Sequence, residues 1–285
     1  MSVAPHSAPP RTPGLLGDTA ARDYAHKLRL FNAFAAPELR ALIGSLALAD
    51  DMCVLDAGCG SGEALGWLAA ALGARGRVVG LDLADAHVGA SRAVAPVQAE
   101  VVQGDLLRAP LAPASFDLVW SVNTINHLRD APSGVRALTA LLRPGGRLAL
   151  GQSSLLPDMY FAWDARLERR VNEAVRRYYR DRYRLSERDL TAVRALLGLL
   201  RRAQLREVTV RTILIERSAP LRQQDAAYLT EAIFRDTWGE RLRPYLGKQD
   251  YDELRRLCDP DDPCYALRRP DFHFLQSFTL ALGAV

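Results

Sequence analysis

Residues 54–62 read Val-Leu-Asp-Ala-Gly-Cys-Gly-Ser-Gly, an apolar run that ends in a glycine-rich turn. The apolar residues predict a buried strand, and Asp56 stands at its end. Gly58, Gly60 and Gly62 follow in the turn, where glycine allows positive φ and a close approach of the backbone to a ligand. In open α/β sheets, ligands bind where a strand ends and the next helix begins. We therefore expect a ligand site around this turn.

The segments on either side of this turn alternate between strand-like and helix-like patterns. We expect strands at residues 52–56, 76–83, 97–103, 116–122 and 147–151, with helices at 65–72, 86–93 and 131–142. The last of these helices stops at Pro144-Gly145-Gly146, which predicts a turn. The alternation is typical of βαβ units, so we expect an α/β fold with a parallel sheet and helices on both faces.

The remaining segments depart from this rhythm. Helices are expected at residues 18–34 and 37–48, before the first strand, and at 157–184 and 186–202, after the fifth. Strands are expected at 208–215 and 272–282, with helical pieces between them. We expect a Pro-rich disordered tail over 1–17 and a single domain over 18–285. Within that domain, the core spans about 38–152 and two helical insertions span about 156–184 and 219–270.

Two more carboxylates follow predicted strands. Asp82 ends the second strand, twenty residues after Gly62, where a carboxylate can accept hydrogen bonds from both hydroxyls of a ribose. Asp105 follows the third strand, where its side chain can accept from an adenine amino group. The glycine spacing is not the G-x-G-x-x-G of dinucleotide-binding proteins, because the third glycine comes one residue early.

Four ordered motifs between residues 52 and 151 together resemble the class I S-adenosylmethionine-dependent methyltransferases, especially those that act on small molecules. The motifs are VLDAGCGSG, VVGLDLA, VVQGDLLRAPLAPASFDLVW and LLRPGGRLAL. The resemblance implies a Rossmann-like, mostly parallel sheet of seven strands with helices on both faces and helical lid insertions. It also implies that the last strand, 272–282, runs antiparallel to the others.

The resemblance assigns cofactor contacts residue by residue. It implies that the methionine part of S-adenosylmethionine lies among Asp56, Gly58, Gly60 and Ser121, the ribose at Asp82 with Leu83, and the adenine at Asp105 with Leu106. Simpler readings stand beside these roles. Asp82 is then a helix cap, Asp105 a turn residue, and Ser121 a group that satisfies the end of its strand.

Two residues are candidates for catalysis. His127 follows the fourth strand, where this family often faces its substrate, and a neutral imidazole there can take a proton from a hydroxyl or amine. Tyr24 lies on the N-terminal helix, which closes over the cofactor in relatives. Packing beside the cofactor pocket is the alternative for both residues.

The two insertions are expected to select the acceptor. Tyr160, Trp163 and Tyr178 are the candidate substrate-binding residues, as part of a run of aromatic residues that can line a cavity. Core packing or a dimer interface is the alternative reading, and a homodimer is left open. Gln204 stands where relatives commonly have glycine before the sixth strand, and we expect only a local change in that turn.

Composition excludes several classes of protein. The 285 residues are 49% hydrophobic and 25% charged, as in an ordinary globular protein. The net charge of +4 does not indicate nucleic-acid binding, because the arginines alternate with Asp and Glu along helical faces. Lys27 and Lys248 are the only lysines among 37 Lys and Arg residues. No apolar run is long enough to span a bilayer, so no membrane partner is expected.

Cysteine usage indicates a reducing cytoplasm. The four cysteines form no C-x-x-C pair, and the N-terminus has no apolar signal region. Cys258 and Cys264 bracket an Asp-Pro-Asp-Asp-Pro loop, for which a disulfide or metal site is the alternative to a plain loop. We expect no metal.

The sequence thus predicts a cytoplasmic enzyme that transfers a methyl group from S-adenosylmethionine to a small molecule, as in secondary metabolism, leaving S-adenosylhomocysteine. Two other classes stay open. One is a nicotinamide-dependent oxidoreductase, against which the glycine spacing and Asp105 argue. The other is a protein that binds S-adenosylmethionine without methylating anything, as a sensor, a subunit or a non-methylating catalyst.

Overall fold

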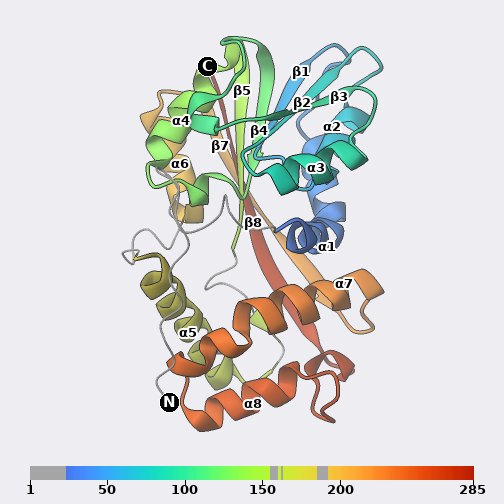
Figure 1. The fold of residues 1–285 in the computed structure, drawn as a ribbon, viewed down its shortest axis with the longest axis vertical. Coiled ribbons are helices and arrows are strands. Elements are labelled where there is room, and N and C mark those ends of the chain that lie inside the picture. Colours follow the sequence, from blue (N-terminus) through green and yellow to red (C-terminus); the bar gives the residue numbers. More distant parts are fainter. Residues whose placement is uncertain (1–23, 155–159, 162, 185–191) are drawn as a thin grey trace.

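The fold is that of a computed structural model, in which residues 24–154, 160–161, 163–184 and 192–285 are described. The expected tail over 1–17 lies outside these residues. Figure 1 shows a sheet in one half of the molecule and a layer of helices in the other, joined by long strands that run through both.

The sheet has the order β3-β2-β1-β4-β5-β8-β6, with β7 paired to the other side of β8. The first five strands are parallel, and β8 runs antiparallel to both β5 and β7. This confirms the mostly parallel, Rossmann-like sheet and its antiparallel last strand. The strands are β1 (Cys53–Ala57), β2 (Arg77–Asp82), β3 (Ala99–Gln103), β4 (Phe116–Val122), β5 (Leu142–Ser153), β6 (Tyr160–Phe161), β7 (Arg206–Ser218) and β8 (His273–Ala284).

Helices cover both faces of the sheet (Figure 1). One face packs against α1 (Ala25–Gly44), α2 (Glu63–Ala71) and α3 (Asp85–Val94), and the other against α4 (Ala131–Ala140) and α6 (Ala192–Arg202). Two short 3-10 helices follow strands at the same edge, η2 (Leu106–Arg108) after β3 and η3 (Ile125–His127) after β4.

A helical layer forms the other half of the molecule (Figure 1). It consists of α5 (Ala165–Tyr183), α7 (Gln223–Ala227), the π-helix η4 (Tyr228–Trp238), η5 (Glu240–Tyr245), α8 (Lys248–Cys258) and the short η6 (Ala266–Arg268). Aromatic contacts hold it together: Trp163 stacks on Phe234 at 6.2 Å between ring centroids and lies 5.6 Å from Trp238. Helices lie within both ranges expected as insertions, at residues 165–183 and 223–268, while residues 155–159 and 162 are outside the described chain.

The N-terminal helix differs from the sequence prediction. Instead of two helices that meet before Pro37, the described residues form one helix, α1, with Pro37 inside it. A proline leaves the carbonyl four residues earlier without its helical donor. Here the Gln224 side chain donates to the Ala33 carbonyl at 3.0 Å and replaces that bond. Burial of the apolar stripe from Phe31 to Ile43 stabilises the helix through this point.

A second difference concerns Pro144-Gly145-Gly146. We expected a turn before the fifth strand, but these residues lie inside β5. The pairing of β4 with β5 shifts register between Phe116 and Leu118, and Gly145 has a φ of +79°. The segment is therefore a bulge in a strand that begins earlier, at Leu142.

Arg217 ties the sheet to α1 and the helical layer. Its guanidinium is buried and donates to Glu38 at 2.7 Å, to Asp225 at 3.0 Å and to the Phe34 carbonyl. It also lies over the Phe34 ring, 4.7 Å from the centroid. These contacts fix α1 between the sheet and the helices that follow β7.

Gln204 adopts a backbone conformation that favours glycine, the residue expected at this position from the family resemblance. Its φ of +59° lies in the left-handed region, which costs a residue with a Cβ about 1 kcal/mol or more. We predict that Gln204→Gly raises the free energy of unfolding by roughly 0.5 kcal/mol, since the added chain entropy of the unfolded state offsets part of the relief. Chemical denaturation measures this. Ala203→Gly, which has no such strain to relieve, should destabilise the protein, and equal effects of the two changes would refute the explanation.

Candidate active site

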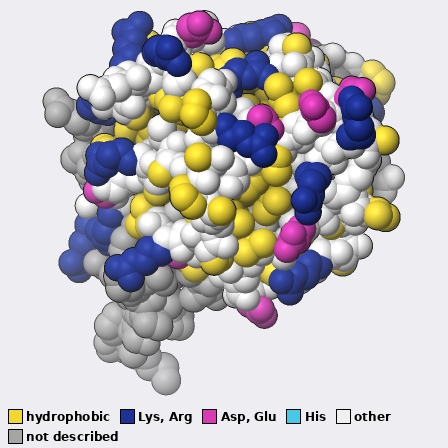
Figure 2. Space-filling model, turned by 90° about the horizontal axis from the view of Figure 1, so that it is seen from above, with side chains coloured by type: hydrophobic (Ala, Val, Ile, Leu, Met, Phe, Trp, Pro, Cys, Tyr) yellow, Lys and Arg dark blue, Asp and Glu magenta, His cyan; other side chains and the backbone are white. Residues whose placement is uncertain are grey.

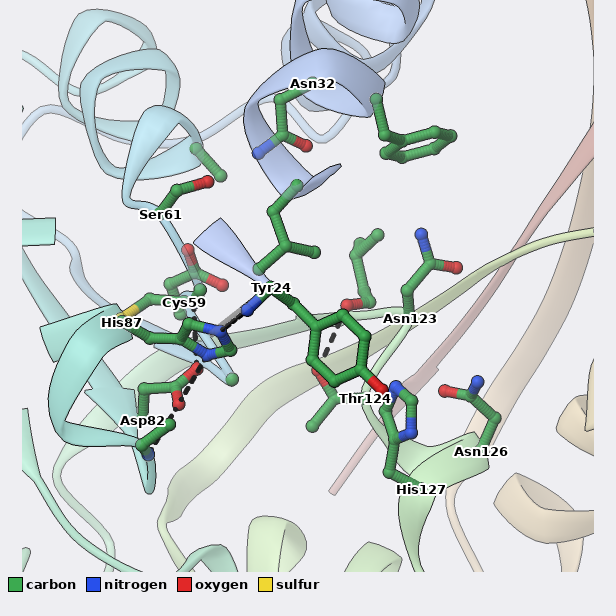
Figure 3. Close-up of a pocket in the computed structure, with 18 of the residues that line it drawn as sticks. Tyr24, Asn32, Cys59, Ser61, Asp82, His87, Asn123, Thr124, Asn126 and His127 are labelled. Carbon is green, nitrogen blue, oxygen red and sulfur yellow. Dashed lines mark hydrogen bonds and ion pairs between the residues drawn. The ribbon is translucent and has the colours of Figure 1, made fainter. Parts of the chain in front are cut away.

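A cavity of about 320 Å³ opens at the carboxyl ends of β1, β2 and β4. The helical layer contributes Tyr179, Tyr183 and Tyr228 to its lining. The other lining residues come from the glycine turn, α3, η3 and α1, and Figure 3 shows side chains from these four segments converging on the cavity. The position is the one where open α/β sheets bind ligands.

The glycine turn lines the cavity with backbone. Gly58 and Gly60 have φ values of +83° and +55°. A Cβ on Gly58 would lie 2.2 Å from Thr124 Oγ1, and one on Gly60 would lie 2.9 Å from Leu28 Cδ1. Gly58 thus requires glycine for conformation and for space, whereas Gly60 requires it for conformation, because the end of the Leu28 side chain can move aside.

Asp82 holds the turn in place. One carboxylate oxygen accepts from the Gly60 amide at 2.9 Å, and the other accepts from the Ala84 amide at 3.0 Å and from His87 Nδ1 at 3.2 Å. Burial disfavours the charged form, but these hydrogen bonds outweigh burial and lower the pKa of Asp82. Asp82 is therefore an anion that keeps acceptor capacity toward the cavity, because the oxygen bonded to Gly60 accepts only one bond among the described residues.

His87 extends this hydrogen-bond network to Tyr24, the residue directly before α1. The Tyr24 amide donates to His87 Nε2 at 3.3 Å, so Nε2 is an acceptor and Nδ1 carries the proton that Asp82 accepts. These bonds link the start of α1 to Asp82, the residue expected to bind the ribose. Figure 3 shows the Tyr24 ring crossing the cavity with its hydroxyl directed toward His127.

Asp56 is a buried carboxyl with an unused oxygen. It is 2% exposed, lines the cavity, and its Oδ2 has no hydrogen-bond partner among the described residues. Burial, followed by the charges of Asp82 and Glu63, raises the pKa of Asp56 to about 8. An orphaned buried oxygen of this kind fits a cationic donor in the cavity, such as an ammonium.

The adenine and ribose candidates line the same cavity. Asp105 accepts from the Leu107 amide at 2.9 Å through Oδ1, while Leu83 and Leu106 contribute apolar surface. The structure therefore brings Asp56, Gly58, Gly60, Asp82, Leu83, Asp105 and Leu106 together as the sequence predicts.

Ser121, unlike the other residues expected to contact the cofactor, lies outside the cavity lining. Its hydroxyl is buried and donates to the Ala57 carbonyl at 2.8 Å, and it does not line the cavity, whereas its neighbours Trp120 and Val122 do. Alternate residues of a strand point to opposite faces. Ser121 joins β4 to β1, as in the simpler reading of this residue.

His127 lies in η3, at the end of β4, and lines the cavity. Burial is the main cause that lowers its pKa, so the imidazole is neutral at physiological pH. Asn126 beside it also lines the cavity, and its Oδ1 has no partner among the described residues. Asn123 Oδ1 accepts from the Ser153 amide and hydroxyl at 2.8 and 3.0 Å, which fixes this loop.

The acceptor candidates mostly lie elsewhere. Trp163 packs on Phe234 and Trp238, Tyr178 contacts Tyr179 and Tyr245, and neither lines the cavity. Of Tyr160 only the backbone is described, paired with Leu275.

The helical layer instead contributes other aromatic residues to the cavity. These are Tyr179, Tyr183 and Tyr228, to which α1 adds Lys27 and Phe31. The sequence held a signal for Lys27, as one of two lysines. It held none that separates Tyr179 from Tyr178.

The cysteines take no part in the cavity chemistry. Cys59 lines the cavity, but burial raises the pKa of its thiol, so it stays protonated and its backbone forms the turn. Cys258 and Cys264 are both free thiols. In the part of the chain that is described, no three His, Cys, Asp or Glu side chains are grouped as metal ligands.

Charge on the molecular surface is mixed where it can be seen. The face in Figure 2 shows Lys and Arg interspersed with Asp and Glu, which agrees with the solvated helical faces expected from the sequence. No helix among the described residues is both long and apolar enough to cross a membrane.

Comparison with known proteins decides the family. A family model described as "Methyltransferase domain" matches residues 55–150, which include the glycine turn, Asp82 and Asp105. Residues 55–150 thus form a methyltransferase domain of the class I S-adenosylmethionine-dependent type. The cofactor of this family is S-adenosylmethionine.

Individual relatives match part of the length of this chain. It is 37% identical to 2-phytyl-1,4-naphtoquinone methyltransferase of Thermosynechococcus vestitus over 107 residues, 37% of this chain and 48% of that protein. It is 37% identical to 27-O-demethylrifamycin SV methyltransferase of Amycolatopsis mediterranei over 122 residues, 41% and 44% of the two chains. The chain thus spans less than half the length of these relatives.

A solved structure shares the fold. Phosphoethanolamine N-methyltransferase 2 of Haemonchus contortus, in complex with S-adenosylmethionine, aligns with a TM-score of 0.52 at 16% identity, over 93% of this chain and 59% of that one. At this identity the likeness shows the fold alone.

Asp82 offers a direct test of the cofactor site. Charged hydrogen bonds are worth roughly 1.5–3 kcal/mol, so we predict that Asp82→Ala lowers the affinity for S-adenosylmethionine about 10- to 150-fold, with an unchanged circular dichroism spectrum. Calorimetric titration measures this affinity. Asp85→Ala, an exposed carboxylate three residues on that does not line the cavity, is the matched control and should bind like the unmodified protein. Unchanged binding by Asp82→Ala would remove Asp82 from the site.

Asp56 predicts proton release on cofactor binding. At about pH 7 the carboxyl is mostly protonated, because its pKa is about 8, and a bound cation lowers that pKa. Titration with S-adenosylmethionine in buffers of different ionisation enthalpy should therefore show proton release, which Asp56→Asn should abolish. Release that persists in Asp56→Asn would contradict the assignment.

The same group predicts how stability depends on pH. The folded pKa of Asp56 is raised above the unfolded value of 3.8, so its contribution to stability is present below about pH 4 and is lost as pH rises toward about 8. We expect Asp56→Asn to lose less thermal stability than the unmodified protein between about pH 5 and about pH 8. Equal losses of thermal stability in the two proteins would mean that the Asp56 carboxyl is not protonated in the folded protein.

Proposed function

We propose that this protein transfers a methyl group from S-adenosylmethionine to a small-molecule acceptor. The observation that carries the proposal is the orphaned Asp56 oxygen, which shares one cavity with the Asp82 and Asp105 carboxylates at the ends of β1, β2 and β3. Three carboxyl groups around one cavity suit a ligand that carries positive charge and many hydrogen-bond donors. S-adenosylmethionine has both properties.

The residues of this chain fit the cofactor in the order of their strands. Asp56 and the backbone of Gly58 and Gly60 would hold the methionine part, Asp82 with Leu83 the ribose, and Asp105 with Leu106 the adenine. When bound, S-adenosylmethionine supplies a methyl group that its sulfonium already activates. The protein's remaining task is to hold the acceptor in line and to exclude water.

The two sides of the cavity support separate positions for the cofactor and the acceptor. α1 lies over the glycine turn through Leu28, and the helical layer covers the opposite side with aromatic residues. An acceptor between them is held against the cofactor half and shielded from water, which favours near-attack geometry. His127 would take the proton of the acceptor, because its neutral imidazole lines the cavity beside Tyr24.

The nature of the acceptor rests on indirect support. Two relatives are named as methyltransferases of a naphthoquinone and of a rifamycin compound, both of which are small molecules. Another relative is named a malonyl-[acyl-carrier protein] methyltransferase, so a carrier-bound acceptor is the contrasting case. We propose a small molecule of secondary metabolism, methylated in the cytoplasm, and leave a homodimer as an expectation.

Label transfer tests the proposal. The protein is incubated with S-adenosylmethionine labelled on the methyl group and with pools of small hydroxy and amino compounds, and labelled product and S-adenosylhomocysteine are measured. Label in a small molecule, with equal release of S-adenosylhomocysteine, is the expected result. Tight cofactor binding without label in any pool would favour the non-methylating alternative, and label only in a carrier-bound acceptor would refute the small-molecule assignment.

His127 separates catalysis from packing. We predict that His127→Ala lowers kcat about 100-fold or more, as expected for loss of a general base, while the affinity for S-adenosylmethionine stays within about twofold. Steady-state kinetics and calorimetry give the two values. His26→Ala removes an exposed histidine that is bonded to Glu231 and serves as the control. Equal losses of turnover and affinity in His127→Ala would assign the residue to packing.

A further inference from the structure

The cavity has two halves of opposite charge. The acidic residues that line it, Asp56, Asp82 and Asp105, all lie at the carboxyl ends of β1, β2 and β3, which form the cofactor half. Among the described lining residues, Lys27 is the one Lys or Arg. The position of Lys27 in the cavity therefore decides which ligand group its charge would meet.

The geometry of α1 assigns Lys27 to the opposite half. Leu28 and Asn32, one turn apart, face the cofactor side: Leu28 lies over Gly60, and Asn32 donates to Glu63 at 2.7 Å. Lys27 and Phe31, also one turn apart, form the adjacent stripe of the helix. Lys27 Nζ donates to Thr237 Oγ1 at 3.0 Å, and the Phe31 ring meets Tyr228 at 5.9 Å, both in η4 of the helical layer.

The surroundings of Lys27 are aromatic. Tyr179, Tyr183 and Tyr228 line this half together with Phe31, and the Tyr179 and Tyr183 rings lie 5.6 Å apart. Burial is the main cause that raises the pKa of Tyr179 to about 12, so its phenol is neutral. Aromatic walls of this kind bind planar rings by stacking and edge contacts.

Among the described residues, the Lys27 ammonium has no carboxylate as a hydrogen-bond partner. Its partner is the Thr237 hydroxyl, which in turn donates to the Ala232 carbonyl at 2.7 Å. Burial, and then repulsion by Arg241, lowers the pKa of Lys27 to about 8, although Asp236 acts in the opposite direction. An anionic oxygen in this half would offset the cost of burying the ammonium.

The choice of lysine is informative in this chain. Arginine occupies every other basic position except Lys248, which is exposed and bonded to Asp252. An ammonium is a compact point charge, whereas guanidinium is a wide planar fork that demands more space. A single oxygen beside an aromatic ring suits the ammonium.

We propose that Lys27 binds an ionisable hydroxyl on an aromatic acceptor and holds that hydroxyl as its anion. The inference rests on the proposed methyltransferase function and deepens it, since it names the acceptor class as phenols and hydroxylated aromatic ring systems. The ring lies between Phe31 and the three tyrosines, and its oxygen meets Nζ. The hydroxyl proton passes to His127, the base proposed above, and Nζ holds the oxygen anion that remains.

Binding of para-nitrophenol tests this without turnover. Its phenolate absorbs visible light, so absorbance reports both the extent of binding and the charge of the bound molecule. The protein, saturated with S-adenosylhomocysteine, is titrated with para-nitrophenol and with para-nitroanisole, which has the same ring but no ionisable hydroxyl. We expect the phenol to bind at least 10-fold more tightly than the ether, and the bound phenol to ionise at a lower pH than in water.

Variants then assign the preference to one side chain. Lys27→Met keeps the length of the side chain and should weaken phenolate binding about 10- to 100-fold, with affinity for the ether and for S-adenosylhomocysteine unchanged. Lys27→Arg should retain part of the preference, and Lys248→Met, which removes the exposed lysine, should retain all of it.

Two results would overturn the inference. One is equal binding of phenol and ether by the unmodified protein, which needs no variant to fold. The other is a phenolate preference that survives in folded Lys27→Met. Failure of the methyltransferase proposal is distinguishable, because it shows as an absence of S-adenosylhomocysteine binding in the same titration.

Discussion

The site depends on one partly buried anion, the Asp82 carboxylate. Its hydrogen bonds reach the Gly60 amide in the glycine turn, the Ala84 amide at the start of α3, and His87. Because His87 in turn accepts from the Tyr24 amide, the same charge also fixes the entry to α1. Hydrogen bonds to a charged acceptor are stronger than neutral ones. Three segments that are distant in sequence therefore keep their relative positions around one group.

The sheet explains why charge is divided within the cavity. Parallel strands bring their carboxyl ends to one edge, so Asp56, Asp82 and Asp105 meet there although they are about 25 residues apart in sequence. The helical layer faces that edge with aromatic side chains, and α1 passes between the two halves. A single helix thus contacts the glycine turn with one stripe and the helical layer with the next, which suits a reaction between a cationic donor and an acidic acceptor.

Much of this architecture follows from the sequence, because strand periodicity and glycine spacing are local signals. The strands through β5 could be predicted in this way, whereas the antiparallel direction of β8 and the cofactor-half residues were expected from the resemblance to the methyltransferase family. Pro37 could not, since Gln224, far away in the chain, supplies the donor that lets α1 continue. Nor could the acceptor half: Tyr178 and Tyr179 differ by one residue, and only the rotation of α5 decides which of them faces the cavity. The role of Ser121 was ambiguous for a similar reason, because the sequence does not tell which face of β4 its side chain occupies.

The measurement that tests the central claim most directly is a calorimetric titration of the purified protein with S-adenosylmethionine, S-adenosylhomocysteine and NAD. The account predicts saturable binding of one molecule of either sulfur compound per chain and no binding of NAD, since the glycine spacing and three carboxylates suit a cationic nucleoside. Binding of NAD alone, or of none of the three, would contradict it.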